Sequence, residues 1–180
     1  MEAIEGRIIL ARMKSSERTS TAGKITIARA ELTDAVSRAL IEALNAELTA
    51  DYPEPGATHF GLAPEEVSGR RGAFLVIRQE GTPVGCGAVR LVDAETGELK
   101  RMYVAREVRG RGLGKQLVAA LEAEARALGA KRLILETGIR QAAAIAVYRG
   151  SGFEPIPLYG EYLLSPETSL CLGKTLQTFA

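Results

Sequence analysis

The sequence has little of what metal sites and disulfide-stabilised folds require. It contains one histidine, His59, so a site built from several histidines is excluded. Its two cysteines, Cys86 and Cys171, lie far apart and form no C-x-x-C pair. That spacing argues against a disulfide framework or a zinc site and fits a reducing cytoplasm. We therefore expect no bound metal, a cytoplasmic location, and two cysteines that act as small buried hydrophobic residues.

The chain also lacks a large excess of either charge and any long apolar run. Its 180 residues include 23 basic and 22 acidic side chains, so no whole-chain field favours nucleic acid or an anionic membrane. No apolar stretch approaches the length of a membrane-spanning helix. We expect neither nucleic acid nor a membrane as a partner. A content of 46% hydrophobic and 25% charged residues fits one compact domain with a real core.

Hydrophobic periodicity predicts the organisation of the chain. Because residues 14–23 are polar and rich in Ser and Thr, we expect residues 1–23 to be a poorly ordered extension and residues 24–180 to form one domain. Alternating or apolar runs predict strands, and i, i+4 spacing predicts helices, the first of them capped by Thr33. The predicted strands are 24–29, 73–77, 84–92, 98–104, 131–136 and 168–176, and the predicted helices are 33–45, 113–128 and 142–149. The consecutive strands 73–77, 84–92 and 98–104 are joined by short turns and must therefore be antiparallel. Together with the helices this predicts an α/β fold with a sheet of mixed direction.

A glycine-rich turn joins the strand ending near Val104 to the helix beginning near Leu113. Glycines let backbone N–H groups approach a ligand without a Cβ in the way. The helix N-terminus adds unpaired donors and a positive partial charge, which suits a pyrophosphate. Arg109 and Arg111 can add charge-assisted hydrogen bonds. The alternative is an ordinary glycine turn with solvated arginines.

Two nucleotide-binding patterns do not match this turn. A Rossmann G-x-G-x-x-G pattern would need glycine where Lys115 stands. A P-loop pattern would need glycine at Arg109 and a hydroxyl at Gln116. Neither pattern therefore predicts the ligand.

Two segments, R-G-R-G-L-G over 109–114 and the stretch 141–153, resemble motifs of the GNAT family of N-acetyltransferases. The turn, R-G-R-G-L-G over 109–114, matches the family's R/Q-x-x-G-x-G/A, which binds the acetyl-CoA pyrophosphate. Downstream, Q-A-A-A-I-A-V-Y-R-G-S-G-F over 141–153 is similar to its N-x-x-A-x-x-x-Y-x-x-x-G-F. The resemblance covers roughly Ala73 to the C-terminus. It implies a mixed, mostly antiparallel twisted sheet flanked by helices, with splayed central strands.

The resemblance also implies an activity and a set of binding residues. Members of the family transfer acetyl directly from acetyl-CoA to a primary amine in a ternary complex, without a metal. The amine is a small amine, an amino-acid derivative or a peptide amine, and homodimers are common among similar proteins. A non-catalytic acetyl-CoA-binding sensor or partner module of the same fold is the alternative. The implied cosubstrate-binding residues are Met102, Tyr103, Val104, Arg109, Gly110, Arg111, Gly112, Leu113, Gly114, Lys115, Gln141 and Tyr148.

Catalytic roles follow from the same comparison. Tyr148 matches the family tyrosine that gives a proton to the leaving thiolate, a role for a phenol near the sulfur. Glu98 stands four residues before Met102, where the histone-acetylating branch has its general base. Ordered water is the alternative base, and a solvated glutamate is the alternative reading of Glu98. Gln141 stands where the family usually has asparagine, so its contact with acetyl-CoA is less certain.

The acceptor pocket lies outside both motifs. Segments before Ala73 and after Phe153 are expected to form it. The prolines and tyrosines of 156–162 are compatible with a small pocket, and acidic residues upstream would favour a cationic amine, unless they are simply solvated side chains. His59 lies in the irregular segment 51–70, which in this family tends to cover the acceptor site, and a lone loop histidine is more often incidental than a substrate contact.

Overall fold

The computed structural model describes residues 23–55, 57–58 and 61–176, so most of the expected N-terminal extension and His59 lie outside the described residues. The elements follow the chain in this order: β1 (Ile25–Arg29), α1 (Ala35–Asp51), η1 (Pro64–Val67), β2 (Gly72–Gln79), β3 (Thr82–Leu91), β4 (Thr96–Val104), η2 (Arg106–Val108), α2 (Leu113–Ala127), β5 (Arg132–Gly138), α3 (Ala142–Arg149), β6 (Glu154–Pro155), η3 (Gly160–Leu164) and β7 (Ser169–Thr175). The expected mixed α/β fold is confirmed.

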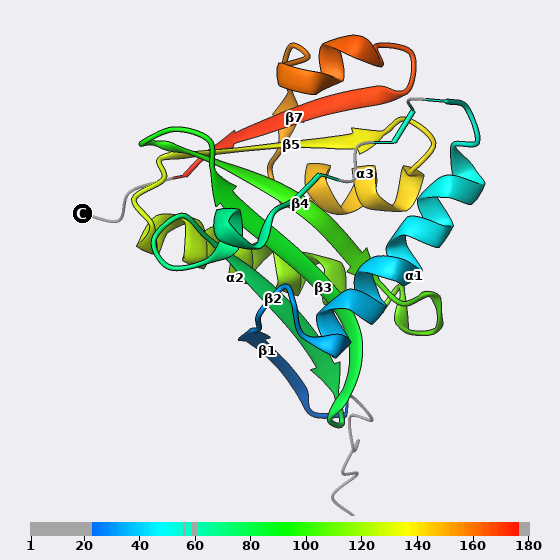
Figure 1. The fold of residues 1–180 in the computed structure, drawn as a ribbon, viewed down its shortest axis with the longest axis vertical. Helices are drawn as coiled ribbons and strands as arrows, with labels where there is room; N and C mark the ends of the chain where they lie inside the picture. The colour runs from blue at the N-terminus through cyan, green and yellow to red at the C-terminus, as the bar shows by residue number, and fades with distance from the viewer. Residues whose placement is uncertain (1–22, 56, 59–60, 177–180) are drawn as a thin grey trace, which may run out of the picture.

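A seven-stranded sheet in the order β1-β2-β3-β4-β5-β7-β6 forms the middle layer. All neighbouring strands are antiparallel except β4 and β5, which are parallel. The helix α1 and the short helix η1 lie on one face of the sheet, and α2 and α3 lie on the other (Figure 1). The sheet is therefore covered on both sides, as a parallel strand pair joined by a helix requires.

Each face of the sheet has its own apolar cluster. The larger one packs α2 and α3 against the sheet and includes Leu117, Leu121, Leu133 and Phe153, all fully buried. The smaller one lies under α1 and η1 and includes Phe74. Leu117 and Leu121 are one helical turn apart, so the i, i+4 pattern of the sequence is the buried stripe of α2.

The parallel strands β4 and β5 separate after half of their length. Their pairing runs from Thr96 with Arg132 to Leu99 with Leu135 and then stops. Beside this point β4 has a register shift against β3, and Arg101 takes a positive φ of 58°. A non-glycine residue in that region is unusual and typical of a bulge that redirects a strand. The bulge and the lost pairing give the splayed central strands that the resemblance implied.

The structure corrects two local predictions and adds two short elements. The N-cap of α1 is Asp34 rather than Thr33, and α1 runs to Asp51 rather than ending at position 45. Tertiary contacts hold the added turns, because Glu47 pairs with Arg109 of the glycine turn. The strand β6 and the helix η3 were not predicted, since neither is long enough to show a period.

No helix in the described part of the chain is long and apolar enough to cross a membrane. Both cysteines are buried free thiols, as predicted. Burial raises the pKa of Cys86 to about 12 and that of Cys171 to about 11. Neither thiol is therefore a reactive thiolate at neutral pH.

Candidate active site

The separation of β4 from β5 opens a pocket between them, which we call the gap pocket. Its volume is about 110 Å³. Beyond Leu99, β4 has no partner strand on its β5 side within the described residues. Its backbone polar groups can therefore bind an extended ligand as a neighbouring strand would. The pocket is lined by Leu44, Leu48, Leu99, Lys100, Arg101, Met102, Glu136, Thr137, Gly138, Gln141, Ala144, Tyr148 and Tyr162.

The glycine turn lies at the end of β4 and forms the N-terminus of α2. Gly110 and Gly112 have φ values of 78° and 80°, which a residue with a side chain adopts only under strain. A Cβ at either position would meet no atom within 4 Å, so the space above them is open. Within the described part of the chain, no hydrogen bond uses the N–H groups of Gly112, Leu113 or Gly114. Three donors at a positive helix end fit an anionic diphosphate.

The charged side chains of this turn are tied more closely to the protein than the sequence suggested. The Arg109 Nε donates to the Val104 carbonyl at 2.7 Å, and its Nη2 pairs with Glu47 at 2.7 Å. The guanidinium also lies 5.9 Å from the ring centroid of Tyr103. Arg109 thus braces the turn against β4 and α1, which leaves the backbone amides as the donors of the turn that have no protein partner within the described residues.

The other charged residues of the turn differ in their contacts. Arg111 is exposed and donates to the Glu107 carbonyl at 3.4 Å. Lys115 reaches the C-terminal end of α3, where a Cβ on Gly150 would lie 3.1 Å from its Nζ. Both side chains are at the rim of the turn, where they can add charge beside the amides.

The remaining predicted binding residues have mixed surroundings. Leu113 is buried in the core, and Gly114 allows α2 to approach Val147 of α3. Met102 lines the gap pocket, as does Gln141. The Gln141 side-chain amide donates to Asp51 at 2.8 Å, so it already has a protein partner.

Tyr148 enters the gap pocket from the α3 side of the sheet. It is 5% exposed and packs edge-to-face against Phe153. Burial raises the pKa of Tyr148, and the carboxylate of Glu136 adds to the shift. The phenol therefore keeps its proton at neutral pH. No hydrogen bond of the described residues occupies its hydroxyl, so the group is available to a ligand in the pocket.

Glu98 lies on the opposite face, at the base of the splay. Its side chain is 1% exposed. One carboxylate oxygen accepts from Arg90 Nε at 2.8 Å and from Arg90 Nη2 at 2.7 Å. The other accepts from the hydroxyls of Tyr159 at 2.9 Å and Tyr162 at 3.0 Å. Both oxygens of the predicted base are thus engaged by protein donors.

The sequence analysis did not single out a second carboxylate in the same region, that of Glu136. Glu136 lines the gap pocket immediately beyond the end of the β4–β5 pairing. Burial raises the pKa of Glu136, whereas a hydrogen bond from Ser169 and the charge of Lys100 act in the opposite direction. In the sequence, Glu136 stands at the end of a short, largely apolar predicted strand, so nothing about its position indicates a role. The only available signal was a glutamate within an otherwise buried run.

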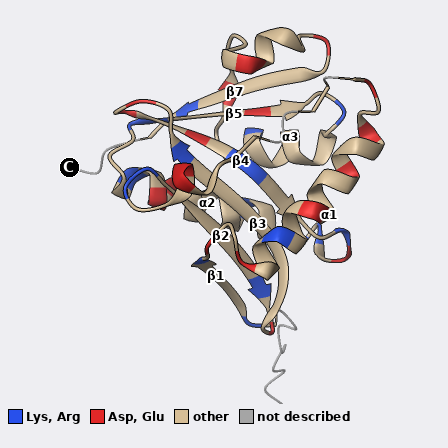
Figure 2. Ribbon diagram, viewed as in Figure 1, with Lys and Arg blue, Asp and Glu red and all other residues tan. Residues whose placement is uncertain are grey.

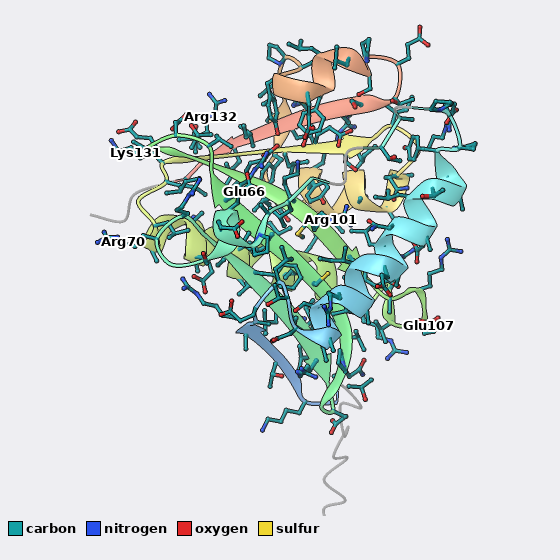
Figure 3. All side chains as sticks on the ribbon, in the orientation of Figure 1. Glu66, Arg70, Arg101, Glu107, Lys131 and Arg132 are labelled. Carbon is teal, nitrogen blue, oxygen red and sulfur yellow. The ribbon has the colours of Figure 1, made fainter. Side chains whose placement is uncertain are left out.

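A larger pocket, the outer pocket, lies beside the gap pocket and shares Tyr162 with it. Its volume is about 540 Å³. The strand β4 carries positions of both charges, and β5 carries an acidic position (Figure 2). Glu66, which pairs with Arg90, lies on the α1 side of the sheet, and so does Arg101, which binds Asn45 of α1 (Figure 3). The lining residues are Gly61, Leu62, Ala63, Glu66, Arg90, Val92, Glu98, Tyr159, Gly160, Glu161 and Tyr162.

Comparison with known proteins identifies relatives of the whole domain. A family model described as "Acetyltransferase (GNAT) family" matches residues 37–153. An IAA acetyltransferase of Azospirillum brasilense is 42% identical over 154 residues, which is 84% of this chain and 98% of that protein. A Klebsiella pneumoniae structure described as an acyl-CoA N-acyltransferase is 39% identical, with a TM-score of 0.71 over 85% of this chain and 98% of that one.

A more distant structure shares the fold. A GNAT family acetyltransferase of Elizabethkingia anophelis, solved with acetyl-CoA bound, has a TM-score of 0.61 at 19% identity, over 84% of this chain and 98% of that one.

Proposed function

Because the chain belongs to the GNAT family of acetyltransferases, we propose that it transfers the acetyl group of acetyl-CoA directly to the primary amine of a small acceptor. The observation that carries the proposal is the combination of three unused amides at the N-terminus of α2 with an unpaired half of β4 leading away from them. The amides at the N-terminus of α2 suit a diphosphate, and the unpaired half of β4 suits an extended chain that contains amide groups. Acetyl-CoA has both parts, joined in that order.

The described residues fit this cosubstrate as a set of backbone donors. The amides of Gly112, Leu113 and Gly114 would hold the diphosphate, with Arg111 and Lys115 at the rim. The unpaired edge of β4 at Met102 to Val104 would hold the pantetheine arm. A backbone N–H of this edge aimed at the thioester oxygen would stabilise the negative charge that develops there, which is typically worth about 2.7–4 kcal/mol.

Tyr148 is proposed as the general acid. It lies in the gap pocket with a proton held firmly at neutral pH, because burial raises the pKa of its phenol. When the carbon–sulfur bond breaks, the phenol gives its proton to the leaving thiolate. General acid catalysis of this kind contributes about 10²- to 10⁴-fold.

The outer pocket is proposed to receive the acceptor. It joins the gap pocket at Tyr162, and its walls combine aromatic rings with the carboxylates of Glu66 and Glu161. Such a wall favours a small amine that is cationic in solution and has an apolar part. Amino acids and aliphatic or aromatic primary amines are the first acceptors to test.

Two measurements test the proposal. Isothermal titration with acetyl-CoA measures binding at the glycine turn, and release of free thiol with a panel of primary amines measures transfer. We expect saturable binding and thiol release with at least one small amine. A protein that binds acetyl-CoA tightly but releases no thiol with any amine would instead be a non-catalytic binding module.

A further inference from the structure

The position of Glu136 relative to the sheet sets it apart from other carboxylates. Leu133 and Leu135 belong to the core cluster under α2, so strand alternation turns Glu136 toward the opposite face. The β4–β5 pairing ends at Leu99 and Leu135, so no paired strand covers Glu136 on its β4 side. Tyr148 belongs to the α2-side cluster and lines the same pocket. A carboxylate and a phenol thus approach one gap from the two faces of the sheet.

The charged groups around Glu136 come from several elements. Lys100 of β4 is the nearby cation, and its Nζ also pairs with Glu161 of η3 at 3.0 Å. Glu98 and Glu161 act to raise the pKa of Glu136, and burial is the largest cause of the rise. Four groups that are neutral at pH 7 have their pKa raised in part by the charge of Glu136: Tyr52 at the C-cap of α1, Tyr148 of α3, Tyr162 of η3 and Cys171 of β7.

Glu98 lines the outer pocket, but it differs from Glu136 in the number of protein donors that its carboxylate already binds. Its two oxygens take four hydrogen bonds from Arg90, Tyr159 and Tyr162. A proton acceptor must come within hydrogen-bond reach of the acceptor nitrogen. Glu98 would have to give up one of these four hydrogen bonds to do so, whereas Glu136 lines the gap pocket with Ser169 as its side-chain hydrogen-bond partner.

We propose that Glu136 is the general base of the transfer and that Glu98 is a positioning residue that fixes the two tyrosine hydroxyls. The inference rests on the proposed transfer of acetyl to an amine. An ammonium acceptor gives one proton to Glu136, which passes it to solvent. The freed nitrogen lone pair forms the C–N bond at the thioester carbonyl, and the C–S bond breaks. Tyr148 protonates the thiolate and regains a proton from the nitrogen, which leaves an amide, a free thiol and one released proton.

The test compares pH profiles of variants, using the amine of the panel that gives the highest rate. Wild-type kcat/KM should rise with pH on the acid side of the profile, as a carboxylate with a pKa above about 4.3 loses its proton. We call this rise the acid limb. Glu136→Gln should lose this limb and about 10²-fold or more of kcat, with acetyl-CoA affinity unchanged. Glu136→Asp should keep the limb at a reduced rate. Glu154→Gln, at an exposed carboxylate of β6, should match wild type.

Glu98→Gln distinguishes the two roles. A positioning residue should lower the rate while the acid limb is retained. If Glu98→Gln abolishes the limb and Glu136→Gln keeps it, Glu98 is the base and the proposal is overturned. Retention of the limb in both variants would indicate water and would overturn it equally. Loss of acetyl-CoA binding in the wild-type protein would instead refute the proposed function.

A second readout does not depend on the acceptor. Titration of ¹³C-carboxyl-labelled glutamate by NMR, assigned from the signal missing in Glu136→Gln, follows the carboxylate directly. We expect an apparent pKa above about 4.3, the ordinary value for glutamate. A pKa at or below that value would remove the base.

Discussion

Glu98→Gln is the substitution whose effect on stability can be worked out most fully. The change keeps the shape of the side chain, so it leaves no cavity. It removes the negative charge and turns one acceptor oxygen into a donor, beside three donors: Arg90, Tyr159 and Tyr162. With its oxygen on Arg90, the glutamine amide faces the hydroxyls of Tyr159 and Tyr162, which must turn from donors into acceptors. In the other orientation the amide faces Arg90, donor against donor, in a site that is 1% exposed.

The expected loss follows from these contacts. Breaking a buried ion pair by altering one partner typically costs about 3–5 kcal/mol. Arg90 keeps its second partner, Glu66, and the glutamine oxygen can still accept from a tyrosine. We therefore expect a loss near the lower limit, about 3 kcal/mol in the free energy of unfolding. For a domain of this length that is a decrease of about 6–12 °C in Tm.

Urea denaturation at pH 7 measures this difference, and Glu66→Gln is the matched control. Glu66 binds the same arginine but is 28% exposed, so its substitution should cost about 1 kcal/mol or less. The decisive quantity is the difference between the two variants. Equal losses, or a loss below about 1 kcal/mol for Glu98→Gln, would refute the claim that the buried carboxylate organises these donors.

Three further predictions concern the pocket and the turn. Tyr148→Phe should lower kcat by about 10²-fold or more while isothermal titration shows unchanged acetyl-CoA affinity, because only the proton donor is lost; an unchanged kcat would exclude the acid role. Gly112→Ala should weaken acetyl-CoA binding in the same titration and cost about 1–2 kcal/mol of stability, since a φ of 80° is strained with a Cβ; full affinity would argue against the turn as the anion site. Burial raises the pKa of Glu136, so the folded protein binds this proton more tightly than the unfolded chain, and stability falls as pH rises above about 4.3. Glu136→Gln should therefore be more stable than wild type at pH 7 in urea and should match it below pH 4; lower stability at pH 7 would contradict the burial of the charge.

Local patterns in the sequence were sufficient for the order of the longer helices and strands and for the glycine turn. The i, i+4 stripe of α2 and the alternating strands depend on periods that hold over many residues, so they predict the sheet and its helical layers. The glycines at 110 and 112 require backbone freedom that is decided locally, and their φ values bear this out. Two motifs at the right separation gave the family, which the comparisons confirm.

Tertiary structure alone decided which charged groups are engaged and which remain available. Nothing in the sequence shows that Arg109 is tied to Glu47 of α1, or that Glu98 meets two tyrosines from η3. These partners are about sixty residues apart along the chain, as the separations of 62, 61 and 64 show. Glu136 lines the gap pocket because the pairing of β4 with β5 ends one residue earlier, at Leu99 and Leu135. Periodicity reports which face a residue occupies, whereas the site depends on what distant segments bring to that face.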